Sequence, residues 1–289
     1  MLLAERAPAK VNLTLHVLRR RADGFHDLES LVAFSCFGDV VRLDSAAPTG
    51  LAVSGPRAEA AGPVADNLVL KAARALQSLA PDIAAGAFHL VKSLPAAAGI
   101  GGGSSDAAAA LRLLARANGL PLDDAHLSQA AATVGSDVPV CLGARARMMA
   151  GRGDNLGPAL ELPPLYAVLV NPGVALETAA VFGRMGLKAG EETGYGGHPS
   201  ISGGQSFEAL LGQLKRARND MEDAAGVLAP VIGHVLAVLA AARGCKLARM
   251  SGSGATCFAL FETRRAASRA ARVIGRDHAG WWVRACVLR

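Results

Sequence analysis

The sequence predicts an α+β protein with two domains. The chain has 289 residues, of which 51% are hydrophobic and 19% are charged, a balance typical of globular proteins. This length is sufficient for two domains that each bury a core. Segments of strand character and of helical character occur in blocks along the chain, which favours an α+β fold over a doubly wound sheet.

The first half of the chain contains predicted strands and helices. Residues 11–17 alternate between apolar and polar, and residues 39–43 do so more loosely, so both are predicted strands. Apolar residues at helical spacing predict a helix over 67–79, with Asp66 or Asn67 as its cap. The remaining predictions here are a strand over 88–91, a helix over 105–117 that ends at Asn118-Gly119, and a helix around 125–134.

The second half begins after a breaker, Leu162-Pro163-Pro164, near which we place the domain boundary. The predicted domains are residues 1–160 and 161–289. Residues 183–206 are rich in Gly, Ser and Pro and are predicted to form a flexible, exposed insert. The other predicted elements are strands over 146–150, 165–170, 247–250 and 256–261, and helices over 227–243 and 266–274.

The charge pattern does not favour a nucleic-acid partner. The net charge is +6 and the pI about 9.4, but the basic residues form separate groups without interleaved aromatic residues. The C-terminal arginines are at helical spacing, which is typical of a solvated helix face: Arg264, Arg265, Arg269, Arg272 and Arg276. Phosphorylated metabolites remain plausible partners.

The cysteine pattern predicts a cytoplasmic protein, and the hydropathy predicts that the chain does not cross a membrane. Five cysteines are widely spaced, odd in number and without a C-x-x-C pair, which suggests reduced thiols. The longest apolar stretch, residues 228–242, is too short to span a bilayer, and the N-terminus carries charges where a signal peptide needs an apolar core.

The most informative segment is the glycine loop, residues 95–106, which leads into an alanine-rich helix. Four glycines within residues 99–103 allow positive φ and a close approach to a ligand, and a helix N-terminus behind them attracts anions. The loop has no Walker lysine and does not fit the Rossmann pattern. Alternatively, it only ends a strand and caps the helix through Ser104 or Ser105.

Three ordered segments together resemble the GHMP kinase superfamily: Pro8-Ala9-Lys10-Val11-Asn12-Leu13, the glycine loop, and Ser251-Gly252-Ser253-Gly254-Ala255-Thr256. The resemblance extends from about Glu5 to Leu260. Three further stretches, residues 21–26, 135–139 and 219–222, look like the members that phosphorylate the 2-hydroxyl of a cytidine-diphosphate-linked methylerythritol in non-mevalonate isoprenoid precursor synthesis.

The resemblance implies a two-domain fold, an N-terminal domain like the second domain of ribosomal protein S5 and a ferredoxin-like C-terminal domain. It also implies ATP with Mg²⁺ that is bound mainly by phosphate oxygens, without a dedicated set of protein metal ligands. A monomer or weak homodimer is expected. The residues implied for nucleotide binding are Pro95, Ala96, Ala97, Ala98, Gly99, Ile100, Gly101, Gly102, Gly103, Ser104 and Ser105, with Asn67 and Lys92 near the nucleoside.

By the same resemblance, Asp137 is the general base and Lys10 its partner. A carboxylate is a weak base for an alcohol, but a loose phosphoryl-transfer transition state requires little early proton removal. The lysine would keep Asp137 ionised and offset negative charge near the nucleophile. The ordinary structural alternative is that Asp137 caps a turn before Pro139 while Lys10 is solvated.

The acceptor is expected to be held by Asn12, Phe25, His26 and Phe182, with Thr178, Gly252 and Ser253 nearby. His26 would face the cytosine edge, and the two phenylalanines would stack on the faces of the base. The family usually has Tyr at the position of Phe25, so this chain keeps the ring but lacks the phenol. Phe25 and Phe182 could instead be core residues, and a hairpin turn would explain the glycines of residues 252–254.

Competing interpretations differ in substrate or in class. The chain could be another kinase of the superfamily, with mevalonate, homoserine or a sugar as acceptor, although these share the glycine loop and not Asp23-Gly24-Phe25-His26. It could also be a non-catalytic nucleotide-binding protein of the same fold. A nucleic-acid-binding module would require a salt-dependent affinity that the charge distribution does not favour.

Overall fold

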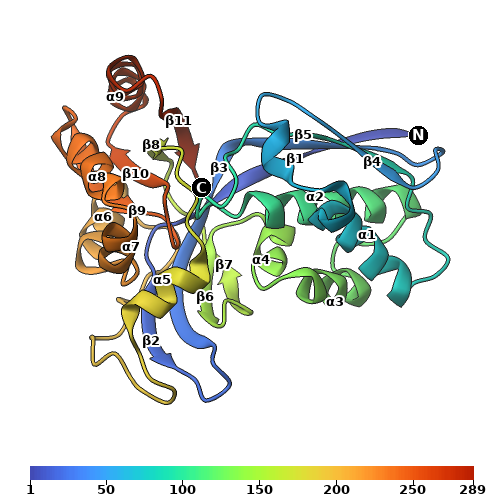
Figure 1. Ribbon diagram of the computed structural model, residues 1–289, viewed down its shortest axis with the longest axis horizontal. Coiled ribbons are helices and arrows are strands. Elements are labelled where there is room, and N and C mark those ends of the chain that lie inside the picture. The colour runs from blue at the N-terminus through green and yellow to red at the C-terminus, as the bar shows by residue number, and fades with distance from the viewer. The chain divides into compact units, whose positions relative to one another are not determined.

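The computed structural model describes all 289 residues and divides into two compact units (Figure 1). Unit 1 comprises Met1–Lys10, Phe37–Ala96 and Gly101–Ala144, and unit 2 comprises Val11–Cys36, Ala97–Ile100 and Arg145–Arg289. The units are therefore interleaved in sequence and do not arise from a single division of the chain. The boundary at residue 160 remains a prediction.

Unit 1 combines a small sheet with a group of helices. The strands β4 (Gly50–Ser54), β5 (Ala87–Val91) and the second half of β3 (His26–Asp44) are neighbours in that order, and β1 (Leu2–Asn12) also pairs with β3. Figure 1 shows the four α-helices on one side of these strands. They are α1 (Leu68–Leu79), α2 (Gly102–Asn118), α3 (Ala125–Val134) and α4 (Val138–Gly143), preceded by the short 3₁₀ helices Ala58–Ala61 and Val64–Asp66.

The helix ends of unit 1 follow from the sequence. The Asn67 side chain accepts a hydrogen bond from the Val69 N–H at 3.0 Å, which confirms the predicted cap of α1. Helix α2 begins at Gly102, three residues before the predicted start, because Gly101 already occupies the N-cap position with φ +59°. It ends at Gly119 with φ +71°, as predicted, since glycine adopts this left-handed conformation without strain.

Unit 2 contains an antiparallel sheet in the order β3, β11 (Trp282–Leu288), β8 (Leu165–Asn171), β10 (Cys257–Phe261), β9 (Cys245–Met250). From β8 onward the chain runs strand, helices, strand, strand, helix, strand, which is the βαββαβ order of a ferredoxin-like domain. Strands β2 (His16–Arg20) and β6 (Arg147–Gly151) pair with β3, and β7 (Asn155–Ala159) pairs with β6.

The helices of unit 2 bury its sheet. They are α5 (Thr178–Met185), α6 (Phe207–Arg216), α7 (Glu222–Leu228), α8 (Val231–Ala241) and α9 (Arg264–Asp277). Helix α8 packs on β9 and β10, and α9 packs on β8 and β11. The core between them includes Val168, Val235, Phe261 and Ile274, and their burial is the main source of stability of this layer.

Two predicted elements are wrong as continuous segments. The strand over 11–17 is interrupted after Asn12, where the backbone N–H of Asn12 donates to the Ser251 hydroxyl and leaves the strand pattern. The helix over 227–243 is divided into α7 and α8 by Pro230, because proline has no N–H to continue a helix. The sequence interpretation also missed β11, α5 and α6.

The insert, residues 183–206, is mostly exposed and irregular after the end of α5. It lies along β2, where the Arg20 N–H donates to the Glu191 carbonyl at 2.9 Å and the Gly190 N–H to the Arg20 carbonyl at 2.7 Å. Because the Thr193 N–H also donates to the Leu18 carbonyl at 2.9 Å, the insert covers the open edge of β2.

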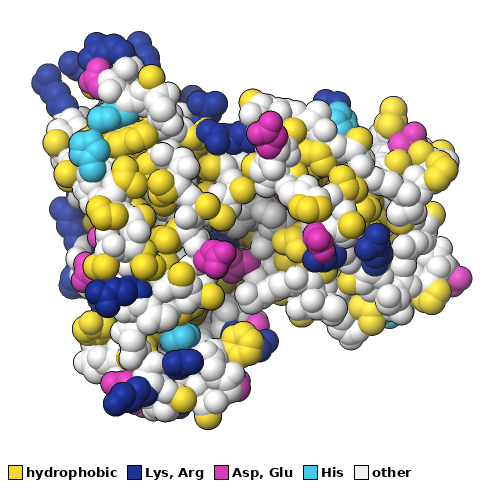
Figure 2. All heavy atoms as spheres, viewed as in Figure 1, with side chains coloured by type: hydrophobic (Ala, Val, Ile, Leu, Met, Phe, Trp, Pro, Cys, Tyr) yellow, Lys and Arg dark blue, Asp and Glu magenta, His cyan; other side chains and the backbone are white.

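Three predictions from composition can be compared with the surface. The arginines of α9 are exposed, as predicted, and Figure 2 shows Lys and Arg side chains gathered over this helix. All five cysteines are free thiols. None of the helices is both long enough and apolar enough to span a bilayer.

Candidate active site

The loop requires glycine at two positions, at Gly99 because of a close backbone approach and at Gly101 because of its positive φ. A Cβ atom at Gly99, where φ is +69°, would lie 2.3 Å from the Ser251 carbonyl oxygen. A Cβ atom at Gly101 would lie 3.1 Å from Cε of Lys10. Gly102 has only ordinary contacts, at 3.7 Å or more. Gly99 and Gly101 are therefore the glycines that the fold requires, and they lead the loop into the N-terminus of α2.

Lys10 and Asp137 form an ion pair in unit 1, with 2.9 Å between Lys10 Nζ and Asp137 Oδ2. Lys10 comes from β1 and its side chain is only 5% exposed, whereas that of Asp137 is 37% exposed. Asp137 is the residue before α4, but its carboxylate makes no capping hydrogen bond. The alternative in which Asp137 only caps a turn and Lys10 is solvated therefore does not describe the structure.

Lys92 belongs to a buried ion cluster with Asp39 and Asp106, which we call the acid–lysine cluster. Its ammonium group contacts Oδ2 of Asp106 at 2.8 Å and also Oδ2 of Asp39. Burial lowers the pKa of Lys92, but the carboxylates of Asp106 and Asp39 outweigh this effect and raise it. Burial raises the pKa of Asp106, and Asp39 adds to that shift against the opposing effect of Lys92.

The acid–lysine cluster fixes the start of the glycine loop. The second oxygen of Asp39 accepts hydrogen bonds from the backbone N–H groups of Ser93 and Leu94. Asp106, the fifth residue of α2, is held from the other side by Lys92. The cluster therefore joins both ends of the loop to β3, and the ammonium of Lys92 is already engaged within the fold.

Two other residues predicted to bind the nucleotide also have structural partners. Both ends of the Asn67 amide are used, because Nδ2 donates to the Ala61 carbonyl at 3.3 Å while Oδ1 caps α1. The Ser105 hydroxyl donates to the Pro8 carbonyl and is buried. Ser104 is half-buried, so of the two loop serines it has the more accessible hydroxyl.

The residues of unit 1 fit a metal that arrives with its ligand. No group of three or more His, Cys, Asp or Glu side chains is close enough to hold a metal ion alone. Oδ1 of Asp106 is buried without a hydrogen-bond partner next to the loop. Mg²⁺ usually keeps water and phosphate ligands in such sites, so the residues present are compatible with it.

The third sequence motif holds the other part of the loop in unit 2. The Ser251 hydroxyl donates to the Gly99 carbonyl at 2.9 Å, and the Thr256 N–H donates to the Ala98 carbonyl at 3.2 Å. Asn219 supports this turn, because its Nδ2 donates to the carbonyls of Met250 and Gly252. The motif therefore folds against the glycine loop.

The residues expected to bind the acceptor lie in unit 2, and several of them are in contact. The hydroxyls of Thr178 and Ser253 are 2.8 Å apart. Asn12 is buried and donates from Nδ2 to the Ser30 hydroxyl at 2.7 Å. The Oδ1 atom of Asn12 lies 3.3 Å from the position of a Cβ at Gly252, so Asn12 and the third motif form one surface.

His26 and Phe182 stack on each other, with ring centroids 4.0 Å apart and planes inclined by 8°. At this separation the rings are in contact, so a base must stack on an outer face or separate them. Phe25 does not join the stack. It is 52% exposed, and the guanidinium of Arg152 lies 4.5 Å from its ring centroid. The expected slot between two phenylalanines is therefore absent from this conformation.

Three histidines of unit 2 have lowered pKa values. Thr14 Oγ1 and His198 Nε2 are 2.6 Å apart, and His198 Nδ1 is 2.7 Å from the Pro199 carbonyl oxygen. His16 lies beside His198 and is fully buried. Burial, and secondarily Arg218, lower the pKa of His16 to about 3, and burial also lowers the pKa of His26 and of His198. These rings are uncharged at neutral pH.

Sequence reasoning missed Asp39, Arg152 and the pair Thr14 and Ser30. Asp39 could have been suspected, since it stands in the apolar strand segment Phe37-Gly38-Asp39-Val40-Val41, where a buried carboxylate needs a cation. No comparable pattern marks Arg152, whose contact with Phe25 depends on the pairing of β6 with β3.

The fold and the glycine loop are typical of a kinase of the GHMP class, and the sequence comparisons show this class. The family model described as "GHMP kinases N terminal domain" matches residues 67–144, and "GHMP kinases C terminal" matches residues 191–279. The chain belongs to the GHMP kinase family.

Relatives of the chain carry the name of one particular kinase of this family. The chain is 61% identical to 4-diphosphocytidyl-2-C-methyl-D-erythritol kinase of Methylobacterium radiotolerans, over 100% of this chain and 99% of the relative. The enzyme of the same name from Azorhizobium caulinodans is 55% identical, with 99% of each chain covered. A crystal structure of 4-(cytidine 5'-diphospho)-2C-methyl-D-erythritol kinase has a TM-score of 0.77 at 33% identity and 99% coverage of both chains. A homoserine kinase structure at 17% identity, with a TM-score of 0.63, shares the fold.

Proposed function

We propose that this protein transfers the γ-phosphate of ATP to the 2-hydroxyl of 4-diphosphocytidyl-2-C-methyl-D-erythritol. The observation that carries the proposal is the Lys10–Asp137 ion pair next to the glycine loop, with Gly101 packed on the side chain of Lys10. A phosphate on the loop N–H groups would then lie near a carboxylate that can accept a proton and a cation that can offset developing charge.

The proposed reaction proceeds by direct transfer. The acceptor oxygen forms a bond to the γ-phosphorus as the bond between that phosphorus and the β,γ-bridging oxygen breaks, and ADP leaves. The hydroxyl proton passes to a carboxylate oxygen of Asp137. The ammonium of Lys10 offsets negative charge at that carboxylate and at the reacting oxygens. Bound Mg²⁺ would neutralise charge on the phosphate oxygens, and Ser104 and the residues of the loop would hold the phosphates.

Acceptor recognition is assigned to unit 2. His26 and Phe182 provide an aromatic platform for cytosine, and Asn12, Thr178, Gly252 and Ser253 provide polar contacts. Since the pKa of His26 is lowered, its ring is neutral and can both donate and accept hydrogen bonds at the edge of a base. We keep as proposed nucleotide contacts Pro95 to Ser105, Asn67 and Lys92. Because the polar ends of Asn67 and Lys92 have partners within the fold, these two would contact the nucleotide through backbone and aliphatic atoms. A cytoplasmic location and a monomeric or weakly dimeric state also remain predictions.

The test is ADP release by the purified protein with ATP and Mg²⁺. We expect turnover with the cytidylyl acceptor and at most background release with mevalonate or homoserine. Turnover with mevalonate or homoserine instead would identify another acceptor class, and ATP binding without turnover on any of these acceptors would favour the non-catalytic alternative. Asp137→Asn is the matched control, because it keeps the size of the side chain and removes its charge.

A further inference from the structure

A pocket lies in unit 2, between the end of α8 and the last turns of α9. Its volume is about 410 Å³. The walls are apolar and consist of Val238, Ala241, Ala242, Ala270, Val273 and Ile274. No residue assigned above to the kinase reaction lines it, so the pocket requires its own explanation.

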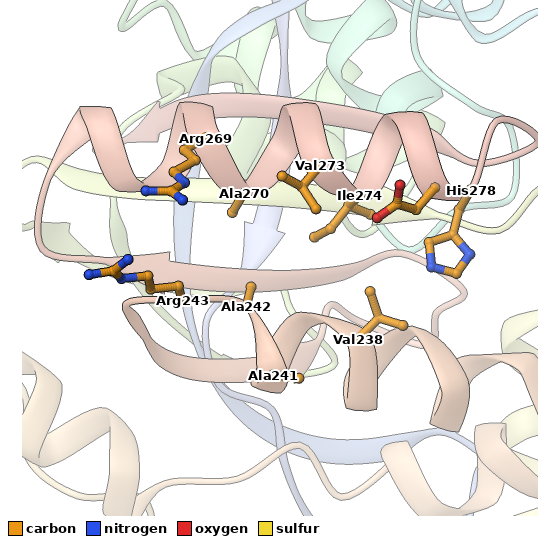
Figure 3. A pocket seen from close by; sticks show the side chains of 10 residues that line it. Val238, Ala241, Ala242, Arg243, Arg269, Ala270, Val273, Ile274 and His278 are labelled. Atoms are coloured by element: carbon orange, nitrogen blue, oxygen red, sulfur yellow. The ribbon is translucent and has the colours of Figure 1, made fainter.

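The two ends of this pocket differ in chemistry. Figure 3 shows Arg243 and Arg269 at one end and His278 at the other, with the apolar side chains between them. His278 stacks on Trp281, with ring centroids 4.0 Å apart. Asp277, which also lines the pocket, pairs with Arg276 at 2.7 Å. The pocket therefore has a cationic end and an aromatic end.

The cationic end has no anion within the protein. Arg243 and Arg269 are both exposed, and neither forms an ion pair or a side-chain hydrogen bond. They come from different elements, since Arg243 follows α8 and Arg269 lies in α9. Two guanidinium groups from separate elements can each direct a pair of N–H donors at one phosphate, whereas a single such pair already matches a carboxylate.

The apolar wall of the pocket includes a position of α9 that faces solvent, where a polar residue is usual. Val273 is 43% exposed and stands among the arginines of α9. Alanine at 241, 242 and 270 leaves the space unfilled. Arg269 and His278 are nine residues apart, which corresponds to about 13 Å along a helix axis. This length suits one aliphatic chain of medium length.

We propose that this pocket binds a free single-chain amphiphile that ends in a phosphate group. The aliphatic chain would lie on Val238, Val273 and Ile274, and Arg243 with Arg269 would bind the phosphate. Apolar burial supplies part of the affinity, and the charge-assisted hydrogen bonds fix the direction in which the ligand enters. The proposal is independent of the kinase reaction, and its test does not use activity.

The test titrates the full chain with decyl phosphate, below the concentration at which this probe aggregates. Trp281 and Trp282 are the two tryptophans of the chain, and Trp281 contacts a residue of the pocket, so intrinsic fluorescence reports binding. Calorimetry gives the dissociation constant. We expect saturable binding of decyl phosphate and at least about tenfold weaker binding of decanol or inorganic phosphate, since each lacks one half of the interaction.

Two variants and a matched control locate the site. The double variant Arg243→Gln with Arg269→Gln should weaken binding by at least about tenfold. The control variant Arg265→Gln with Arg272→Gln also removes two positive charges, but from residues of α9 that do not line the pocket. It should change the affinity for decyl phosphate by less than about twofold. Ala241→Phe, at an exposed position, should fill the pocket and abolish binding.

Four results would overturn the proposal. One is equal affinity for decanol and decyl phosphate, and another is equal loss in the two double variants, which would indicate a general charge effect. A third is binding to vesicles of phosphatidylcholine and phosphatidic acid without binding of monomeric decyl phosphate, which would indicate a membrane surface. The fourth is the absence of saturable binding, with all variants folded by circular dichroism.

Discussion

The residues proposed for catalysis in unit 1 and those proposed for recognition in unit 2 use different chemistry. Unit 1 contains the Lys10–Asp137 pair and the acid–lysine cluster, so its polar interior is built from lysine–carboxylate contacts. Unit 2 contains the stacked rings of His26 and Phe182 and a second pair of neutral histidine rings, His16 and His198. The difference is that unit 1 buries lysine–carboxylate contacts near the glycine loop, whereas the rings proposed to meet a nucleobase in unit 2 are uncharged.

The lysines of unit 1 show a further division. Lys92 is enclosed with two carboxylates and links β3 to the glycine loop. Lys10 is equally buried, but its partner Asp137 is partly open to solvent and to a ligand. We therefore expect Lys92 to act on stability and Lys10 to act on rate.

The largest effect is expected for Lys92→Met. This change leaves Asp39 and Asp106 buried without their cation, which costs about 3 to 5 kcal/mol of stability for a buried pair. Urea unfolding measures the loss. Lys71→Met, at an exposed lysine of α1 that pairs with Asp66 at 3.5 Å, is the control and should cost less than about 1 kcal/mol. Equal losses in the two variants would contradict a structural role for the cluster.

Next in size are Lys10→Met and Asp137→Asn. Each should lower kcat by roughly 100-fold or more and leave substrate binding largely unchanged, because both groups act mainly in the transition state. Single-turnover ADP formation, with binding of ATP measured separately, gives both quantities. If either variant reacted at nearly the unmodified rate, its catalytic assignment would be withdrawn.

Phe182→Ala tests the recognition residues of unit 2. Loss of the ring should weaken cytidine diphosphate binding by about 5- to 150-fold, which corresponds to roughly 1 to 3 kcal/mol for base stacking. ATP affinity should be nearly unchanged. Titration with the two ligands separately measures this, and equal losses for both would indicate that Phe182 is a packing residue.

The buried histidines predict a pH dependence of stability in unit 2. The folded-state pKa of His16 is about 3, below the unfolded value of about 6.5, so the unfolded chain binds more protons at acid pH. The contribution of neutral His16 to the free energy of unfolding is therefore fully present above pH 7. It decreases as the pH falls, by about 2 kcal/mol at pH 5. We expect the free energy of unfolding, measured with urea between pH 5 and pH 7, to depend less steeply on pH in His16→Gln than in the unmodified protein. An unchanged slope would exclude His16 as a cause.

The smallest effect is expected for Phe25→Tyr. The ring is exposed, and tyrosine can keep the contact with Arg152, so the acceptor KM should change by less than about twofold. Phe25→Leu removes the cation–π contact, worth about 0.5 to 1 kcal/mol at an exposed site, and the KM should stay within a few-fold of the unmodified value. A large effect of Phe25→Tyr would mean that the base contacts the ring edge directly.

Much of the local structure could be predicted from the sequence. Asn67 capped α1 and Gly119 ended α2, because both act through hydrogen bonds and dihedral angles of their own segments. The break at Pro230 could also have been predicted, since proline ends a helix wherever it falls in its interior. The three ordered motifs were sufficient to predict the family. The spacing of the arginines in α9 predicted which face of this helix is exposed to solvent.

By itself the sequence determined the fold class, the family, the glycine loop and the candidate residues Lys10, Asp137, His26 and Phe182. Only the tertiary structure decided which of these residues meet. Asp39 joins Lys92 from 53 positions away, and Arg152 rather than a base lies over Phe25. The physical reason is that ion pairs and ring contacts depend on strand pairing and burial, which couple distant segments, whereas caps and turns depend on residues a few positions apart.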